Sequence, residues 1–507
     1  MLERRTLKFI LVALCAALLC LVVAISASKS QQECLGIPLI EETELHSYTQ
    51  TDTLDMQGLL FNGFKAAVDV QTKTVYISQS KSKLSHYALL EGALQHRDPT
   101  YSLCLLHDAA LDDLQAVVHN NQTLTLIIKK GNSYQRANIV FSTLPVLRID
   151  GNETGLTDDE GRSIFAGDFT LWAGLDPLLE QYSTRSGSLE FHIRGNTSAT
   201  TGKPPWKLSV KSNNGSPKDA TFLNLGTDDD WILNSLTFDD TRLREKFFSD
   251  LWNKNASTTP WNYPMTSGTY TEVVMNGQFL GLFLLQRRID PKYLNLQKND
   301  VLLKSTTYGV SSVQAAYEIL SNDVDSGAIY ATMQSVFDGT DCSAYHVNNM
   351  IDTNLLLQFA SAHDNFGLKN IYHVLQKNGN TYVHYLIPWD TDMSFGVHIR
   401  PEYGFCYDYD VSISMLAQRM ETSGLKKFRP EYDRLAALRW HELRCSLLQE
   451  NILMNEIDVL NNQLNESGAL LRDKALWGDR YKGEDTSEKL KTFISERLAF
   501  LDAHYAS

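Results

Sequence analysis

The sequence has few cysteines, and none lies in a pattern that binds metal. Seven occur in 507 residues, and two of them, Cys15 and Cys20, fall in an N-terminal apolar stretch. Each of these two follows a leucine rather than a small residue, so a lipoprotein cleavage site is not indicated. The five in the body are Cys34, Cys104, Cys342, Cys406 and Cys445. Because no C-x-x-C pair occurs, a zinc site is not expected, and the odd number leaves at least one thiol outside any intrachain disulfide.

The sequence also lacks an excess of positive charge. It has 46 Lys and Arg against 60 Asp and Glu, a net charge of −14. Nucleic acid is therefore not expected as the main partner, because such binding needs a basic surface. An acidic surface suits a basic protein substrate, but it suits simple solubility as well. With 43% hydrophobic and 21% charged residues, the chain has the composition of a globular protein, and its length predicts two or three domains.

One long apolar run occurs, near the N-terminus. Arg4, Arg5 and Lys8 precede 17 apolar or small residues from Phe9 to Ile25. This is long for a signal-peptide core and at the lower limit for a membrane-spanning helix, so residues 1–28 are predicted to be a signal peptide or a membrane anchor. In either case the positive flank stays in the cytoplasm and the body is exported. The protein is therefore expected to be extracellular or at the cell surface, held by an N-terminal helix if cleavage does not occur.

Residues 29–145 are predicted to form a small β-sandwich-like domain. After a polar tether, short strand-like runs such as FKAAVDV, KTVYISQ and TLTLIIKK alternate with turns rich in Asn and Gly. Two interpretations are open: a surface or carbohydrate-binding module, or a spacer that holds the rest of the chain away from the membrane. No aromatic platform can be read from the sequence, which favours the spacer.

The stretch 382–396, YVHYLIPWDTDMSFG, carries the strongest chemical signal. A strand-like run ends at Asp390 and Asp392, and a polar loop with Asp364 and Asn370 lies just upstream. Carboxylate and amide oxygens are the ligands that Mg²⁺ or Mn²⁺ prefers. Protein kinases hold metal-bound phosphate with a similar order of Asp, Asn and Asp. A structural Asp pair at a strand end is the simpler alternative, and a haloacid-dehalogenase phosphatase with its D-x-D nucleophile is another.

A second polar turn precedes a lysine-containing strand. In RGNTS, residues 194–198, Gly195 would allow close approach of the backbone to phosphate. Lys207, at the start of the strand KLSVKS, is placed to reach phosphate oxygens as the strand lysine of kinases does, and Lys203 is its rival. Taken alone, the stretch is equally consistent with an ordinary turn.

Several further elements are predicted from local patterns. Asn276-Gly277 between two apolar runs indicates a β-hairpin with a type I′ turn. Leu243, Phe247 and Leu251 share a helix face, with Asp240 as the expected N-cap. Residues 345–362 are predicted to be a buried helix, and the chain from residue 431 onward is predicted to be mostly helical, with Asp485 and Glu488 as a capping box. The acidic run 228–230 is either a solvated loop or a Ca²⁺ site.

Together these elements resemble the spore-coat CotH kinase family. The residues that carry the resemblance occur in that family's order: Arg194-Gly195-Asn196-Thr197-Ser198, Trp231-Ile232-Leu233, Asn276-Gly277 with Gly281, Pro388-Trp389-Asp390, and Phe395-Gly396. The resemblance covers roughly residues 146–430. It implies an α+β fold in which an atypical protein-kinase-like domain, residues 146–507, follows the β-sandwich-like module.

The resemblance also implies an activity and its site. The expected reaction is Mg²⁺- or Mn²⁺-dependent transfer of the ATP γ-phosphoryl group to Ser or Thr of a surface or secreted protein. Asp390, Asn370 and Asp392 would be metal ligands, and Asp364 would orient or deprotonate the acceptor hydroxyl. The nucleotide would contact the residues Arg194, Asn196 and Lys207.

The sequence departs from the family pattern at two positions. Most members carry Glu where this chain has Arg287, and most carry Asn where it has Glu245. If the family's Glu pairs the phosphate lysine, that pairing is absent here or comes from another residue. The competing interpretation is a non-catalytic adhesin or structural protein of the CotH type. Nucleotide binding with and without Mg²⁺ would separate the two.

Overall fold

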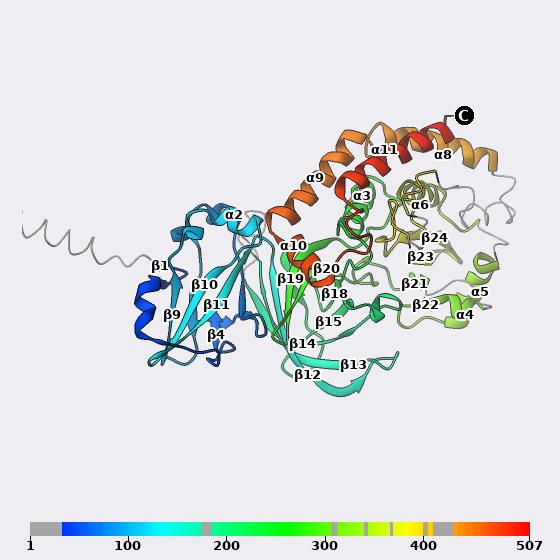
Figure 1. Ribbon diagram of the computed structural model, residues 1–507. Helices are drawn as coiled ribbons and strands as arrows, with labels where there is room; N and C mark the ends of the chain where they lie inside the picture. Colours follow the sequence, from blue (N-terminus) through cyan, green and yellow to red (C-terminus); the bar gives the residue numbers. More distant parts are fainter. Residues whose placement is uncertain are drawn as a thin grey trace, which may run out of the picture.

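The computed structural model describes residues 33–173, 184–305, 312–338, 343–365, 369–398, 404–408 and 429–506. The predicted signal or anchor segment, residues 1–28, lies outside them. Among the helices of the described residues, none is long and apolar enough to cross a membrane. Figure 1 shows an N-terminal β-rich region at one end, a barrel in the centre, and a smaller sheet covered by helices at the other end.

The N-terminal region contains two sheets within the described residues. The larger has the order β1-β2-β9-β10-β11-β7-β6, with β3 beside β11, and the smaller has the order β5-β4-β8. The bounds are β1 Glu33–Cys34, β2 Ile37–Ile40, β3 Thr49–Gln50, β4 Leu59–Phe61, β5 Phe64–Lys65, β6 Ala67–Asp69, β7 Thr74–Ser78, β8 Leu94–His96, β9 Tyr101–Leu106, α2 Leu114–His119, β10 Leu124–Lys130 and β11 Ser133–Ser142. Both sheets contribute to one apolar core. The β-rich character is as predicted, although β2–β9, β3–β11 and β7–β11 pair in parallel.

This region shares its core with the barrel that follows. Trp172 and Phe279, both on barrel strands, belong to the N-terminal core cluster, and Phe279 stacks on Tyr76 with ring centroids 4.1 Å apart. The backbone N–H of Phe279 also donates to the Asp69 carboxylate at 3.0 Å. The boundary predicted at residue 145 therefore lies at a packed junction, and the independence of residues 29–145 stays a prediction.

Seven strands form a closed barrel in the order β12-β13-β14-β15-β18-β20-β19 within the described residues. Their bounds are β12 Val146–Thr157, β13 Ser163–Trp172, β14 Arg185–Ile193, β15 Trp206–Lys211, β18 Asp230–Asn234, β19 Gly268–Met275 and β20 Gln278–Arg287. The short pair β16 Ala220–Thr221 and β17 Thr227–Asp228 lies between β15 and β18 in the chain. A parallel pairing of β12 with β19, Val146 opposite Glu272, closes the barrel. Large apolar side chains fill its interior, among them Phe169, Phe191, Trp231 and Phe283.

The predicted hairpin is confirmed as β19 and β20. Asn276 and Gly277 both have positive φ, 50° and 74°, as a type I′ turn requires. Gly281, farther along β20, also has a positive φ of 90°, and a Cβ there would lie 2.4 Å from a carboxylate oxygen of Asp473. The glycine thus allows β20 to approach the helix that carries Asp473.

A four-stranded antiparallel sheet, β22-β21-β23-β24, positions the acidic motif. Its strands are β21 Val301–Ser305, β22 Tyr317–Ile319, β23 Ile371–Asn378 and β24 Thr381–Pro388. The predicted buried helix is confirmed as α6, Val347–Ala360, which packs against β24 and is buried from Asn349 onward. A haloacid-dehalogenase phosphatase is not supported, because Asp390 follows an edge strand of an antiparallel sheet rather than a strand of a parallel α/β fold.

The remaining described helices surround this sheet and arch over the barrel (Figure 1). They are α3 Arg244–Thr258, α4 Val313–Ala316, α5 Ser326–Asp338, α8 Arg429–Arg444, α9 Glu450–Glu466, α10 Ala469–Trp477 and α11 Ser487–His504. Leu243, Phe247 and Leu251 are fully buried as predicted. The predicted helical character of the C-terminal part is confirmed as well.

Two predicted caps are wrong. Helix α3 begins at Arg244 and its first N–H donates to Asp239, whereas Asp240 accepts from the backbone N–H groups of Arg480 and Tyr481. Helix α11 is capped by Thr486 rather than by Asp485. The local pattern assigned both carboxylates to caps, but each one instead accepts hydrogen bonds from residues far away in the chain: Asp240 from Arg480 and Tyr481, and Asp485 from Arg244.

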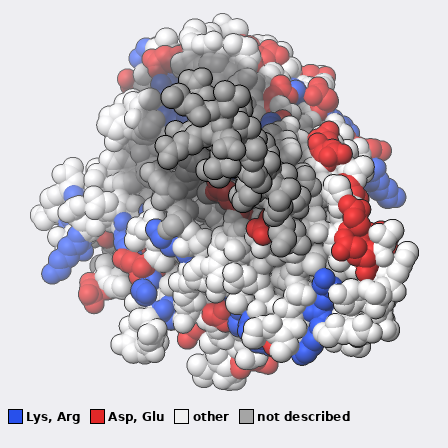
Figure 2. Space-filling model, turned by 90° about the vertical axis from the view of Figure 1, so that its left-hand side faces the viewer, with Lys and Arg blue, Asp and Glu red and all other residues white. Residues whose placement is uncertain are grey.

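Charges of both signs are interspersed on the face that Figure 2 shows, which is the N-terminal end of the molecule. Among the described residues visible there, both signs are mixed on the left and below, Asp and Glu gather along the right-hand side, and no continuous basic area is seen.

Candidate functional site

The two predicted polar loops meet at one end of the four-stranded sheet. Asn370 immediately precedes β23, and Asp390 follows β24 with Trp389 between. The register pairs Ile371 with Pro388, and the Trp389 N–H donates to the Asn370 carbonyl at 2.9 Å. The antiparallel pairing of β23 and β24 therefore brings the two loops together, although Asn370 and Asp390 are twenty positions apart in the chain.

The first loop joins Asp364 to Asn370 directly. The Asn370 side-chain amide donates to Asp364 Oδ2 at 2.7 Å, and the Lys369 ammonium lies 2.9 Å from the same oxygen. Helix α6 delivers this loop: it ends at Ala360, and Ser361 caps it in a left-handed conformation. One Asp364 carboxylate oxygen is thus held by two donors, one from Lys369 and one from Asn370.

Asn365 was not singled out by sequence reasoning, but its side chain links the two loops by hydrogen bonds. Its side-chain amide donates to the backbone carbonyls of Asn370 at 3.0 Å and of Trp389 at 2.8 Å. The residue is 1% exposed, and its Oδ1 has no hydrogen-bond partner among the described residues. A buried amide oxygen without a partner is costly, and it is a hard donor of the kind that Mg²⁺ accepts.

The second loop concentrates carboxylates out of water. Asp390 has a left-handed φ of 57°, a conformation that Asp tolerates better than most residues. Burial raises the pKa of Asp390, the positive charge of Arg194 opposes this, and the charge of Asp364 adds to it. Burial, followed by the charges of Asp390 and Glu245, holds the pKa of Asp392 well above its ordinary value. This accumulation of buried negative charge favours a bound cation.

The predicted metal ligands Asn370, Asp390 and Asp392 include two carboxylates and one amide. Within the described residues, the one group of three acids whose oxygens lie within 4.8 Å of one another is Asp219, Asp228 and Asp229, away from this loop. Of the predicted ligands, Asp390 and Asp392 are near enough for the charge of Asp390 to add to burial in raising the pKa of Asp392, and Asn370 is joined to this loop through the Trp389 N–H.

Glu245 is a further residue that the sequence did not assign. It lies in the first turn of α3, is fully buried, and accepts hydrogen bonds from the Thr391 N–H at 2.7 Å and the Thr391 hydroxyl at 2.9 Å. Burial, followed by the charge of Asp390, raises the pKa of Glu245 to about 7. Glu245 thus fixes the residue between Asp390 and Asp392, a role that no local pattern in α3 could reveal.

Arg244, beside it, holds the end of the motif. Its guanidinium donates to the Ser394 carbonyl at 3.0 Å and forms paired bonds of 2.9 and 2.8 Å with Asp485. Gly396 closes the motif with φ of 92°, where a Cβ would lie 2.7 Å from the Phe405 ring. The Phe395-Gly396 part of the motif is therefore explained by packing around a buried ion pair.

Arg194 is brought to the acidic loop from the barrel. It follows β14, and its guanidinium lies 5.4 Å from the centroid of the Trp389 ring. Burial lowers its pKa, and the nearby Tyr372 and Asp390 oppose that effect. Asn196, also a predicted nucleotide contact, is exposed in the same loop.

The two candidate lysines have different surroundings. Lys203 is 2% exposed, and its ammonium lies 2.6 Å from Asp473 and 2.5 Å from the Leu282 carbonyl. Burial lowers the pKa of Lys203 to about 8. These contacts tie Lys203 into the junction between the barrel and α10. Lys207, on β15, is more accessible and lies 3.0 Å from Asp230 on the neighbouring strand.

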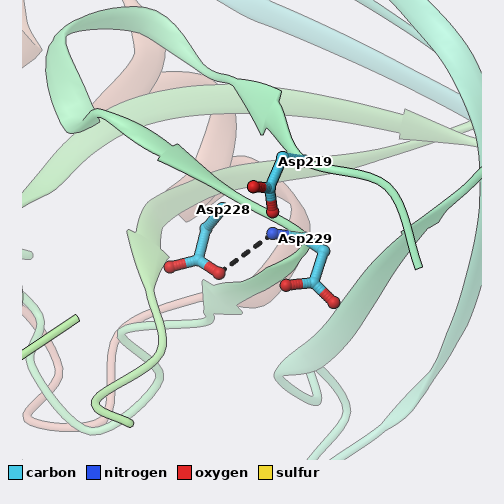
Figure 3. A group of neighbouring side chains, drawn as sticks. All are labelled: Asp219, Asp228 and Asp229. Carbon is cyan, nitrogen blue, oxygen red and sulfur yellow. Dashed lines mark hydrogen bonds between the residues drawn. The ribbon is translucent and has the colours of Figure 1, made fainter. Parts of the chain in front are cut away.

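The acidic run 228–230 is held by cations of the chain itself. Figure 3 shows Asp219, Asp228 and Asp229 together, with the Asp229 N–H donating to Asp228 at 2.9 Å. The Lys292 ammonium lies 2.5 Å from Asp219 and 3.5 Å from each of the other two. The Ca²⁺ alternative therefore has a lysine already placed among its candidate ligands.

Arg287, the departure from the family pattern, belongs to the same group. It donates twice to Asp228 Oδ2, at 2.9 and 2.5 Å, and lies over the Tyr293 ring. Asp228 is fully buried, so Arg287 supplies the charge that this carboxylate needs.

The acidic loops are also distinct from a polar cavity of about 600 Å³ at the junction of the N-terminal region and the barrel. Its charged lining comes from Lys65, Arg97, Arg148, Asp150 and Asp168. Arg148 spans the two aspartates, and none of the lining residues belongs to the site around Asp390.

Comparison with known protein families finds a match. The model of the family described as CotH kinase protein matches residues 191–501, from β14 through α11, which is more than half of the chain. No curated protein matches. The matched range contains every predicted site residue, and membership implies a kinase that uses ATP. The chain belongs to the CotH kinase family.

Proposed function

We propose that this chain is an exported protein kinase that transfers the γ-phosphoryl group of ATP to Ser or Thr of a surface or secreted protein. The observation that carries the proposal is the joining of the two polar loops. Asn370 is bonded both to Asp364, through its side chain, and to Trp389, through its carbonyl, directly before Asp390. An acceptor-side Asp and a phosphate-side Asp are thereby held in one constellation, as phosphoryl transfer requires.

The oxygen donors of this constellation fit Mg²⁺ or Mn²⁺. Asp390, Asn370 and Asp392 would hold the ion, and the buried, unpartnered Oδ1 of Asn365 adds a hard donor nearby. When bound, the ion supplies positive charge against the phosphate oxygens. The raised pKa of Asp390 and of Asp392 supports this assignment, because a cation would relieve the repulsion among these carboxylates.

Asp364 serves the acceptor. The acceptor hydroxyl oxygen bonds to the γ-phosphorus as the bond to the β–γ bridging oxygen breaks, and the hydroxyl proton passes to Asp364. Lys369 and Asn370 orient the carboxylate for this role. Arg194, Asn196 and Lys207 are proposed to contact the nucleotide, with Arg194 fixed against Trp389. Such positioning and charge stabilisation account for most of the catalysis in phosphoryl transfer.

Export rests on the N-terminal sequence. Three positive residues before an apolar run of 17 favour an outward-facing body. Protease added to intact cells of the host should degrade residues 29–507. Protection of the whole body would contradict export and leave the kinase proposal untouched.

The decisive test is calorimetric titration of ATP into the wild type, Asp390→Asn and Asp364→Asn, with and without Mg²⁺, alongside melting curves. Asp390→Asn should lose the Mg²⁺-dependent part of ATP affinity, because the charge that balances the cation is gone. Asp364→Asn should still bind ATP while transfer to a protein substrate falls about 10²–10⁴-fold. A wild type that binds no ATP under any metal condition would refute the kinase proposal and favour the non-catalytic surface protein.

A further inference from the structure

Lys304 is a cation near Asp390 that none of the recognised motifs includes. It lies on β21 opposite Tyr372 of β23, and Tyr372 lies opposite Ile387 of β24. Side chains alternate across a sheet, so Lys304 points away from its neighbours Leu303 and Ser305, which are fully buried. Lys304 itself is only partly buried. It therefore faces the same side of the sheet as Tyr372.

Packing connects Lys304 and Arg194 beside Asp390. The Arg194 guanidinium lies 5.4 Å from the ring centroid of Trp389. Trp389 packs edge-on against Tyr372, the residue opposite Lys304, with ring centroids 5.9 Å apart. The charge of Asp390 acts on both cations and opposes the effect of burial on each. The two cations and Arg288 also repel: Arg194 and Arg288 both act to lower the pKa of Lys304. Arg194 comes from the barrel and Lys304 from the four-stranded sheet, so the group spans the two parts of the molecule.

Neither Lys304 nor Arg194 forms an ion pair within the described residues, although Glu318 lies opposite Lys304 on β22 and its charge, like that of Asp390, opposes the lowering of the Lys304 pKa by burial. Across the described ranges, no carboxylate oxygen lies within 4.0 Å of the Lys304 ammonium or the Arg194 guanidinium. The Arg194 guanidinium lies over the Trp389 ring. The other lysines considered for phosphate are paired, Lys203 with Asp473 and Lys207 with Asp230. Removing two cations from water without a matching carboxylate is unfavourable unless an anion completes the site.

We propose that Lys304 and Arg194 form a phosphate-binding pair that binds the phosphate chain of ATP, with Lys304 on the four-stranded sheet and Arg194 at the end of barrel strand β14. The proposal rests on the proposed kinase function and adds a residue to it. Phosphate oxygens bound between Arg194 and Lys304 would lie beside Asp390, the proposed metal ligand, and a kinase needs its phosphates next to the metal. Arg194 would contribute a planar donor set, and Lys304 a point charge.

The test compares Lys304→Met with a matched variant, Lys211→Met. Lys211 is also a partly buried lysine on a β-strand, but it pairs with Glu190 on the barrel wall, outside the site. Titrations use MgATP and, as a probe without a nucleoside, inorganic tripolyphosphate with Mg²⁺. Lys304→Met should weaken both ligands about 10- to 100-fold, the range for a lost bond to a charged group, while Lys211→Met should change neither. Lys304→Arg should restore part of the loss.

Melting of the ligand-free proteins separates binding from folding. Lys304→Met should melt at or above the wild-type temperature, because it removes a partly buried, unpaired cation. A lower melting temperature combined with unchanged affinity for both ligands would overturn the pair and make Lys304 a structural residue. If the wild type binds ATP and Lys304→Met binds it equally well, the pair fails while the kinase function stands. If the wild type binds tripolyphosphate but not ATP, the pair stands and the kinase function fails.

Discussion

Glu245→Gln should make the protein less sensitive to rising pH. The Glu245 carboxyl is fully buried and its pKa is raised from 4.5 to about 7. Between pH 4.5 and 7 the folded state therefore binds more protons at this site than the unfolded state does. Stability is lost as pH rises through that window, because ionisation is penalised only in the folded protein. A glutamine keeps the side-chain shape and an oxygen that can accept from Thr391, but it cannot ionise.

The size of the effect follows from the pKa difference. A shift from 4.5 to about 7 corresponds to about 3 kcal/mol. Through this group, the free energy of unfolding of the wild type is therefore about 3 kcal/mol lower above the pH window than below it. The free energy of unfolding of Glu245→Gln minus that of the wild type should therefore increase by about 3 kcal/mol from pH 4.5 to pH 8. Removing the Glu245 charge also removes one cause of the raised pKa of Asp392, which acts in the same direction.

Urea denaturation in EDTA at several pH values measures this difference without divalent cations on the neighbouring carboxylates. Glu496→Gln, an exposed position on α11, is the matched control and should give a difference that does not vary with pH. A flat difference for Glu245→Gln, within about 1 kcal/mol, would mean that Glu245 is not held in a raised-pKa state. The reasoning about crowded carboxylates around Asp390 would then be wrong.

Three other outcomes are expected. Arg287→Ala should destabilise the protein by about 3 kcal/mol in chemical denaturation, because buried Asp228 loses its main partner. The same change should leave ATP affinity unchanged. Loss of binding without loss of stability would contradict this expectation. Burial and the neighbouring His373 hold the pKa of His384 well below 6.5, so the folded state binds fewer protons and the melting temperature should fall as pH drops below 6.5, a fall that His384→Gln should reduce. Residues 146–507 expressed alone should bind ATP, since no candidate residue precedes 146. The fragment should melt at a lower temperature, because Trp172 and Phe279 would lose the N-terminal residues that pack against them. A folded fragment that does not bind ATP would refute the boundary.

Local patterns predicted the elements that local forces determine. The Asn276-Gly277 turn, the buried helix α6 and the acidic end of β24 all follow from residue types at fixed spacings. The order of these elements resembles the CotH family, and the family match over residues 191–501 confirms that resemblance.

The features that the sequence did not predict depend on contacts between segments that lie far apart in the chain. The parallel contact of β12 with β19 closes the barrel between residues that are more than a hundred positions apart. The register of β21 against β23 places Lys304 near Asp390, and α3 brings Glu245 to Thr391. Each of these residues looks ordinary in its own segment. The misassigned caps have the same cause, since Asp240 and Asp485 are used by distant parts of the chain.

The departure at Arg287 shows why one position alone is weak evidence for a decayed site. If a family glutamate on this strand pairs the phosphate lysine, then Arg287 removes that partner. The neighbouring strand β18 supplies another: Trp231 lies opposite Arg287 in the register, and the residue before it, Asp230, is 3.0 Å from Lys207. The adjacent Asp228 neutralises Arg287 itself. Lys207 thus has an acidic partner on β18, and Arg287 has its own partner in Asp228, so the departure at position 287 does not by itself show a decayed site.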